Sequence, residues 1–161
     1  MPDNYIDLLL ALLEESITKC YQHDFILIER NMEQASVARI YYYMQDALNN
    51  DEKFVTFSNY NLDNEYNKNG EHVKTTPRHP NGTRPDITLH RRGNNGGNLM
   101  VLEFKSHNGG APDDDFDKLE DFTTSGIYDY CLGVSIRLIR GGAEYNYFQD
   151  GRGVMREGLR Q

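Results

Sequence analysis

Apolar residues recur at helical spacing in two stretches of the N-terminal third of the chain. The first stretch runs from residue 3 to about residue 20 and places one apolar stripe on a helix: Ile6, Leu9, Leu10, Leu13 and Ile17. The second begins near Asn31, where Asn31 and Gln34 fit a capping box, and continues to Leu48. We therefore predict helices over 3–20 and 31–48, with the short apolar run 25–28 packed against the first.

Beyond the second helix, short apolar runs alternate with residues that form turns. Residues 54–57 and 59–66 each fit a short strand. Residues 71–82 are polar, contain two prolines and have no periodicity, so they are expected to form a mobile loop that orders on substrate. Residues 84–107 form two runs rich in Ile, Leu, Val and Met around the turn sequence RRGNNGG, which predicts a β-hairpin.

The last third of the chain predicts one more helix and two more strands. The helix covers 113–124, where three aspartates match the positive end of the helix dipole and Lys118 can pair with Asp114 or Asp121. Strands are expected over 128–139 and 143–149, and the basic tail 151–161 is expected to fray. This order predicts an α/β fold, a central mixed β-sheet flanked by helices, in a single domain over 1–161.

Composition narrows the class of protein. With 161 residues, 38% of them hydrophobic, the chain can bury a core without disulfides. Its two cysteines have no metal-ligand spacing, no apolar run approaches the roughly 18 residues of a membrane span, and acids stand near the N-terminus instead of the basic region of a signal peptide. We therefore expect a reduced, cytoplasmic protein with no membrane partner.

The formal net charge of −8 argues against a simple nucleic-acid coating protein, but the charge is unevenly distributed. Residues 113–121 hold six acids and one lysine, whereas residues 74–92 hold one acid and five basic residues. These five are candidates for contact with a phosphate backbone, through an attraction that weakens as salt rises: Lys74, Arg78, Arg84, Arg91 and Arg92.

The hairpin carries the candidate chemistry. Side chains alternate along a strand, so Glu103 and Lys105 project to one face, and a hairpin brings Asp86 back toward Glu103. Two carboxylates at close range need a cation, and Mg²⁺, or Mn²⁺ in its place, suits carboxylate oxygens, water and phosphate. Lys105 would orient or deprotonate the attacking water or stabilise the charged transition state.

The pattern Pro85-Asp86, a hairpin and Glu103-Phe104-Lys105 resembles the PD-(D/E)XK nuclease superfamily, the restriction-endonuclease-like fold. The acidic helix with DKLEDFT, the strand YDYCLGVSIRL and the segment DNEYNK at 63–68 look like its small stand-alone members. The resemblance covers about 31–149. It implies an αβββαβ core, preceded here by an extra N-terminal helix, and a Mg²⁺ site made by the two acids and the lysine.

The resemblance also implies a further acid from the first core helix as a metal or water ligand. Glu33, which opens that helix, is the candidate; Glu29 is the alternative, and a capping role for Glu33 is equally open. Glu65 would lie beside the same face, either with a direct role or as an exposed strand residue.

The sequence therefore predicts a metal-dependent nuclease that hydrolyses phosphodiester bonds, with DNA favoured over RNA. No helix-turn-helix, zinc finger or reading domain is recognisable, so the enzyme would be non-specific, structure-selective, or directed by a partner protein or a second copy in a homodimer. Two other readings stay open. One is a catalytically inactive nucleic-acid-binding relative, and the other is a protein-interaction module whose negative charge suits a basic partner.

Overall fold

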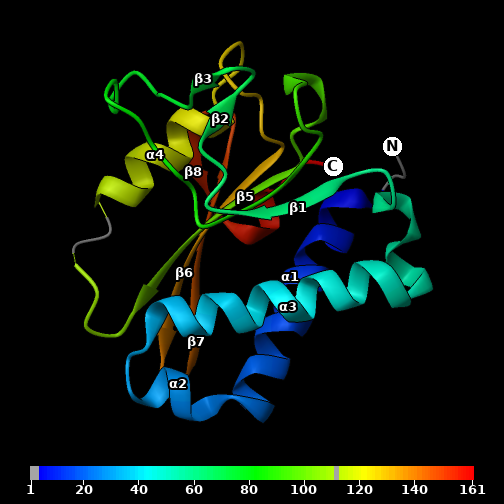
Figure 1. Ribbon diagram of the computed structural model, residues 1–161, viewed down its shortest axis with the longest axis vertical. Helices are drawn as coiled ribbons and strands as arrows, with labels where there is room; N and C mark the ends of the chain where they lie inside the picture. Colours follow the sequence, from blue (N-terminus) through cyan, green and yellow to red (C-terminus); the bar gives the residue numbers. More distant parts are fainter. Residues whose placement is uncertain (1–3, 111–112) are drawn as a thin grey trace.

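A mixed sheet of six strands forms the centre of the chain and is flanked by helices (Figure 1). The computed structural model describes residues 4–110 and 113–161. The strands follow the spatial order β1-β4-β5-β6-β7-β8, with β5 and β6 parallel and the other neighbours antiparallel. Their bounds are β1 (Asn61–Asn64), β4 (Ile87–His90), β5 (Met100–Ser106), β6 (Leu132–Ile139), β7 (Gly142–Gln149) and β8 (Arg152–Val154). The predicted α/β fold with a mixed central sheet is confirmed.

Two groups of helices cover opposite faces of this sheet. The helices α1 (Tyr5–His23), α2 (Phe25–Glu29) and α3 (Glu33–Asn50) pack on one face, and α4 (Asp113–Thr123) packs on the other (Figure 1). Residue 3, the predicted start of the first helix, lies outside the described residues. The predicted capping box was wrong: α3 begins at Glu33, and Met32 at its N-cap position makes no side-chain cap.

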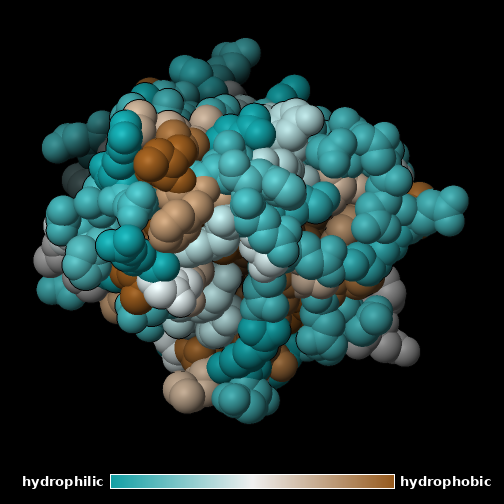
Figure 2. All heavy atoms as spheres, turned by 90° about the horizontal axis from the view of Figure 1, so that it is seen from below, coloured by the Kyte–Doolittle hydropathy of each residue, from teal (hydrophilic) through white to brown (hydrophobic). Residues whose placement is uncertain are grey.

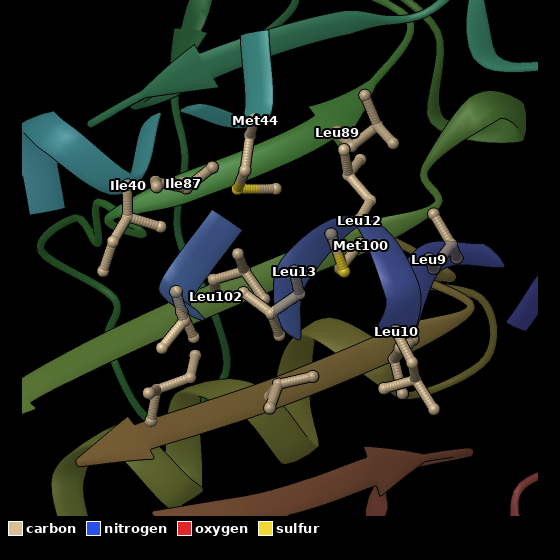
Figure 3. Close-up of a cluster of buried hydrophobic side chains, with 14 of the residues drawn as sticks. Leu9, Leu10, Leu12, Leu13, Ile40, Met44, Ile87, Leu89, Met100 and Leu102 are labelled. Atoms are coloured by element: carbon tan, nitrogen blue, oxygen red, sulfur yellow. The ribbon is translucent and has the colours of Figure 1, made fainter. Parts of the chain in front are cut away.

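Strand β5 separates two hydrophobic clusters because its side chains alternate between the faces. Met100, Leu102 and Phe104 enter the large cluster under α1 and α3, whereas Val101 enters the smaller one under α4. Figure 3 shows side chains from α1, α3, β4 and β5 pointing toward one another in the large cluster. Glu103 and Lys105 therefore belong to the α4 face, as the alternation predicted.

Three further predictions about local structure were wrong. Residues 54–57 lie in a 3-10 helix, η1 (Glu52–Phe57), instead of a strand, because a short and mostly apolar run fits either structure. The predicted mobile loop contains the end of a small hairpin, β2 (Lys68–Asn69) with β3 (His72–Val73), and is tied to α4. The tail contains β8 and the 3-10 helix η3 (Arg156–Gly158), so it is packed instead of frayed. A further 3-10 turn, η2 (Asn95–Gly97), lies between β4 and β5.

The surface is mostly hydrophilic, and the two cysteines form no disulfide. Hydrophilic side chains cover most of the face seen in Figure 2, with small groups of hydrophobic ones between them. Cys20 is buried, Cys131 is half-buried, and both are free thiols. None of the helices in the described parts of the chain combines the length and the apolar character needed to cross a bilayer.

Candidate metal centre

Asp86 and Glu103 lie beside each other at the end of the β4–β5 ladder. Ile87 pairs with Leu102, so the next residue outward on each strand is Asp86 or Glu103. The backbone N–H of Phe104 donates to Asp86 Oδ2 over 2.7 Å, which fixes that carboxylate against β5. The hairpin thus brings together the two acids that the sequence singled out.

Glu103 is an almost fully buried acid with an unused acceptor. Glu103 is 3% exposed, and none of the described residues forms a hydrogen bond with its Oε1 atom. Burial raises the pKa of Glu103 well above its usual value, and the nearby charge of Asp86 raises it further. An isolated buried carboxylate is costly, so this position favours a proton or a cation.

The same surroundings act on Asp86. Burial raises its pKa to about 6, the N–H of Phe104 opposes the shift, and the negative charges of Asp115 and Glu33 add to it. Burial is the main cause of both raised pKa values, and neighbouring carboxylates add to each shift, so the ionised forms of Asp86 and Glu103 are costly here. A divalent cation would lower that cost.

Lys105 reaches toward α4 from the same face of β5. Its Nζ lies 3.1 Å from Asp115 Oδ2, so the two side chains form an ion pair. Burial lowers the pKa of Lys105, but the carboxylates of Asp115, Glu33 and Glu103 outweigh that effect and leave it above its usual value. Lys105 is therefore a fixed ammonium beside the acidic pair.

Asp115 holds a second lysine as well. Lys118 Nζ lies 3.2 Å from Asp115 Oδ1 and 3.1 Å from Asp114 Oδ2, so one of the two predicted partners of Lys118, Asp114, is confirmed. The other, Asp121, pairs with Arg78 instead. Sequence reasoning missed Asp115, although its spacing to Leu119 and Phe122 on one helix face was a signal that it points inward.

Glu33 stands at the first turn of α3 and reaches the end of β5. Its Oε2 accepts a hydrogen bond of 2.6 Å from the backbone N–H of Ser106. Glu33, Glu65 and Asp86 share the lining of a pocket of about 190 Å³ with nearby residues of α3 and β1. Glu29, the alternative acid, pairs instead with Arg140 at 2.8 Å.

The acids do not converge into a larger ligand set. Within residues 4–110 and 113–161, no group of three or more His, Cys, Asp or Glu side chains is placed to hold a metal ion. The structure therefore brings Asp86 and Glu103 together and lines the adjoining pocket with Glu33, Glu65 and Asp86, but it does not assemble Asp86, Glu103 and Glu33 around one point. Glu65, with a φ of 48°, stays exposed and lies 3.5 Å from Arg84.

The five basic candidates separate into two groups. Lys74 is 2% exposed and faces the protein interior, and Arg78 is paired with Asp117, Glu120 and Asp121 of α4. Neither presents a free charge to a phosphate backbone.

The other three basic residues lie on the surface near the hairpin. Arg84 and Arg91 are exposed, and Arg91 stacks over the ring of Tyr60 at 4.6 Å. Arg92 is exposed too, but it forms an ion pair with Asp63. Arg84 is thus the exposed basic candidate nearest the acidic pair in sequence, whereas Arg91 lies at the opposite end of the β4–β5 ladder.

The sequence was compared with models of protein families and with curated proteins. No model of a protein family matches the chain, and no curated protein matches it. The resemblance to the PD-(D/E)XK superfamily therefore stays a prediction that depends on the residues and their geometry.

Proposed function

We propose that this chain is a metal-dependent nuclease of the PD-(D/E)XK type that hydrolyses phosphodiester bonds in DNA. One observation carries the proposal: Glu103, whose buried Oε1 has no hydrogen-bond partner among the described residues, lies beside Asp86 at the end of the β4–β5 ladder, with the Lys105 ammonium on the same face of the sheet. A purely structural carboxylate would have acquired a hydrogen-bond partner during folding, because leaving it without one is expensive.

A pair of carboxylates is enough to bind Mg²⁺ or Mn²⁺, because neither ion requires a larger set of protein ligands. Mg²⁺ is commonly held by one or two carboxylates and fills its other positions with water and substrate phosphate. When bound, such an ion lowers the pKa of a coordinated water and neutralises charge on the scissile phosphate. Asp86 and Glu103 would hold it, and Lys105 would place its ammonium beside the reacting phosphate. Glu33 would anchor the end of β5 and line the approach.

The order of elements supports the restriction-endonuclease-like core. From α3 onward, leaving aside the separate β2–β3 hairpin and the 3-10 helices, the chain runs α3, β1, β4, β5, α4 and β6, which corresponds to αβββαβ. α1 is the additional N-terminal helix. Asp86 directly precedes β4, and Glu103 and Lys105 lie within the neighbouring strand β5, where rigid backbone can hold them.

The exposed side chains suggest how a substrate would meet the site. Arg84 lies two residues before Asp86, so it can contact a phosphate near the site, and Arg91, in the turn at the other end of the β4–β5 ladder, can contact one farther along the substrate; neither contact reads bases. Binding would therefore weaken as salt rises and would depend little on sequence. Selection of a target would come from nucleic-acid structure, from a second copy of the chain or from a partner protein.

The acidic surface favours one other function, a protein-interaction module. The net charge is −8, and Asp113 and Asp114 at the start of α4 are exposed. A basic protein partner would suit this surface. The catalytic proposal accounts for the buried pair, which such a module would not need.

A cleavage assay separates these functions. The wild-type chain is incubated with Mg²⁺ or Mn²⁺ and with supercoiled, linear or single-stranded DNA or RNA. Asp86→Asn, Glu103→Gln and Lys105→Met should each lose about 100-fold or more of the cleavage rate, since the first two remove a metal-binding carboxylate and the third removes the ammonium beside the reacting phosphate. Glu144→Gln, an exposed carboxylate on β7 of the same sheet, should cleave like the wild type.

A second measurement tests the metal without depending on cleavage. The unfolding midpoint of the wild type should rise with Mg²⁺ or Mn²⁺ concentration, because a ligand that binds only the folded state stabilises it. Glu103→Gln should show a much smaller rise. If the metal stabilises the wild type but no nucleic acid is cut, the chain binds metal and the nuclease proposal is wrong.

A further inference from the structure

Asp115 is a buried carboxylate that joins α4 to the candidate site. It lies in the first turn of α4, and its side chain is 2% exposed. One of its oxygens lies 3.1 Å from the amine of Lys105 on β5, and the other lies 3.2 Å from the amine of Lys118 on its own helix. A single acid thus connects the lysine of the site with the helix that covers that face of the sheet.

The arrangement restrains Lys105 strongly. A lysine has a long, flexible side chain, and its amine gains no fixed direction from the backbone alone. Asp115 supplies that direction, because its buried carboxylate would lose one of its two cationic partners if the amine of Lys105, whose side chain is 27% exposed, moved away. Lys118 holds the opposite oxygen and also contacts Asp114 at 3.1 Å, so the Asp115 carboxylate cannot easily rotate away from Lys105.

We propose that Asp115 is the positioning residue of this site, and that it fixes the amine of Lys105 beside Asp86 and Glu103. The inference rests on the proposed nuclease function. Asp115 would not touch the substrate or the metal; it would act through Lys105. Misplacing a reacting group by about 1 Å costs as much as 100-fold in rate, so the effect of losing this restraint should be measurable.

The alternative is that Asp115 merely anchors α4 to the sheet, and the helix offers a matched control for this role. Asp121 is also on α4, is 6% exposed, and forms an ion pair with Arg78 of the neighbouring loop. Asp121 therefore shares the burial, charge and ion pairing of Asp115 but has no contact with Lys105. Substitution of either acid should lower stability, and only substitution of Asp115 should affect chemistry.

The first test compares Asp115→Asn with Asp121→Asn in cleavage assays at saturating Mg²⁺. Asp115→Asn should lower kcat by at least about tenfold with KM within about twofold of the wild type, because ground-state binding does not need the fixed amine. Asp121→Asn should keep kcat within about twofold per folded molecule. Asp115→Glu, which retains the charge, should recover part of kcat.

A double-mutant cycle then asks whether Asp115 acts through Lys105. In a Lys105→Met background, adding Asp115→Asn should lower kcat by less than about twofold, since the group that Asp115 positions is already missing. If the two losses multiply, Asp115 does not act through Lys105 and the inference is overturned. Should Asp115→Asn fail to fold, the cycle is run with Asp115→Glu, whose carboxylate is displaced by one methylene.

The outcomes separate the two proposals. A wild-type chain that cuts no nucleic acid overturns the proposed function and the inference together. A wild-type chain that cuts, with Asp115→Asn as active as Asp121→Asn, overturns the inference alone.

Discussion

At the scale of single residues, Lys74 is the most unusual side chain outside the candidate site. Its amine is enclosed by four aromatic rings, with centroids 5.3 to 5.6 Å away, and donates to the hydroxyl of Tyr130 over 3.2 Å. The rings belong to Tyr66, Phe122, Tyr128 and Tyr130. Burial lowers the pKa of Lys74 to about 8, although Asp63 acts in the opposite direction. Aromatic faces attract the ammonium form, which helps the protein tolerate the buried charge.

The lowered pKa predicts how stability depends on pH. An unfolded lysine stays protonated up to its ordinary pKa, so between about pH 8 and pH 10 the unfolded chain binds more protons than the folded one and stability rises with pH. We therefore subtract the free energy of unfolding of Lys74→Met from that of the wild type. This difference should increase from pH 7.5 to pH 9.5, and its total increase with pH should approach about 3 kcal/mol. Urea unfolding at several pH values measures it.

The exposed Lys68→Met variant is the control for this experiment. Its difference from the wild type should stay nearly flat over the same range. A flat difference for Lys74→Met as well would contradict the lowered pKa of Lys74.

At the scale of elements, α4 and the loop before Arg84 act as a pair. Arg78 is bound by three acids of α4, and the ring of His79 lies 2.8 Å from Asp114. The backbone of Thr75 both donates to and accepts from the hydroxyl of Tyr128. The loop was predicted to be mobile because it lacks apolar periodicity, but charges on a distant helix hold it.

Arg78→Gln should loosen this loop. Hydrogen exchange followed by mass spectrometry should show protection of the amides in 75–83 falling by about tenfold or more, since the loop would open locally without unfolding the sheet. Arg84→Gln, at the end of the same loop with one long contact to Glu65, should leave that protection unchanged. Equal protection in Arg78→Gln and the wild type would show that the charges do not hold the loop.

At the scale of the whole molecule, the C-terminal segment closes the sheet onto the N-terminal helix. β8 pairs with β7, and Arg156 forms an ion pair with Glu14 of α1. The side chain of Gln149 exchanges two hydrogen bonds with the backbone of Arg160, at 2.8 and 2.9 Å. Residues from both ends of the chain therefore contribute to the same side of the fold.

Removing residues 152–161 should destabilise the entire domain. The chain would lose a strand, an ion pair and several hydrogen bonds worth about 1 kcal/mol each, so the free energy of unfolding should fall by about 2–4 kcal/mol. Urea unfolding of the two chains measures the loss, and Arg156→Ala alone should cost less than about 1 kcal/mol as a partly exposed ion pair. A truncated chain as stable as the full one would mean that the segment is only adsorbed on the surface.

Comparison across these scales shows where sequence reasoning succeeds. The long elements and the meeting of Asp86 with Glu103 were predictable, because periodicity and hairpin pairing are local properties of the chain. The roles of Lys74, Arg78 and Asp115 were not, since each depends on which distant element packs against it. A count of basic residues could not distinguish a lysine inside an aromatic enclosure from one on the surface.

The hydrogen bonds that Asp86 and Glu33 accept from β5 have a consequence for association between chains. β4 stops pairing at Ile87, so the N–H groups of Phe104 and Ser106 would otherwise form an unprotected strand edge. Both N–H groups are occupied by carboxylates instead, which bring negative charge to that edge. A strand from another chain would therefore meet no free N–H donors and a negatively charged surface at this edge. The two acids thus protect the domain against edge-to-edge aggregation.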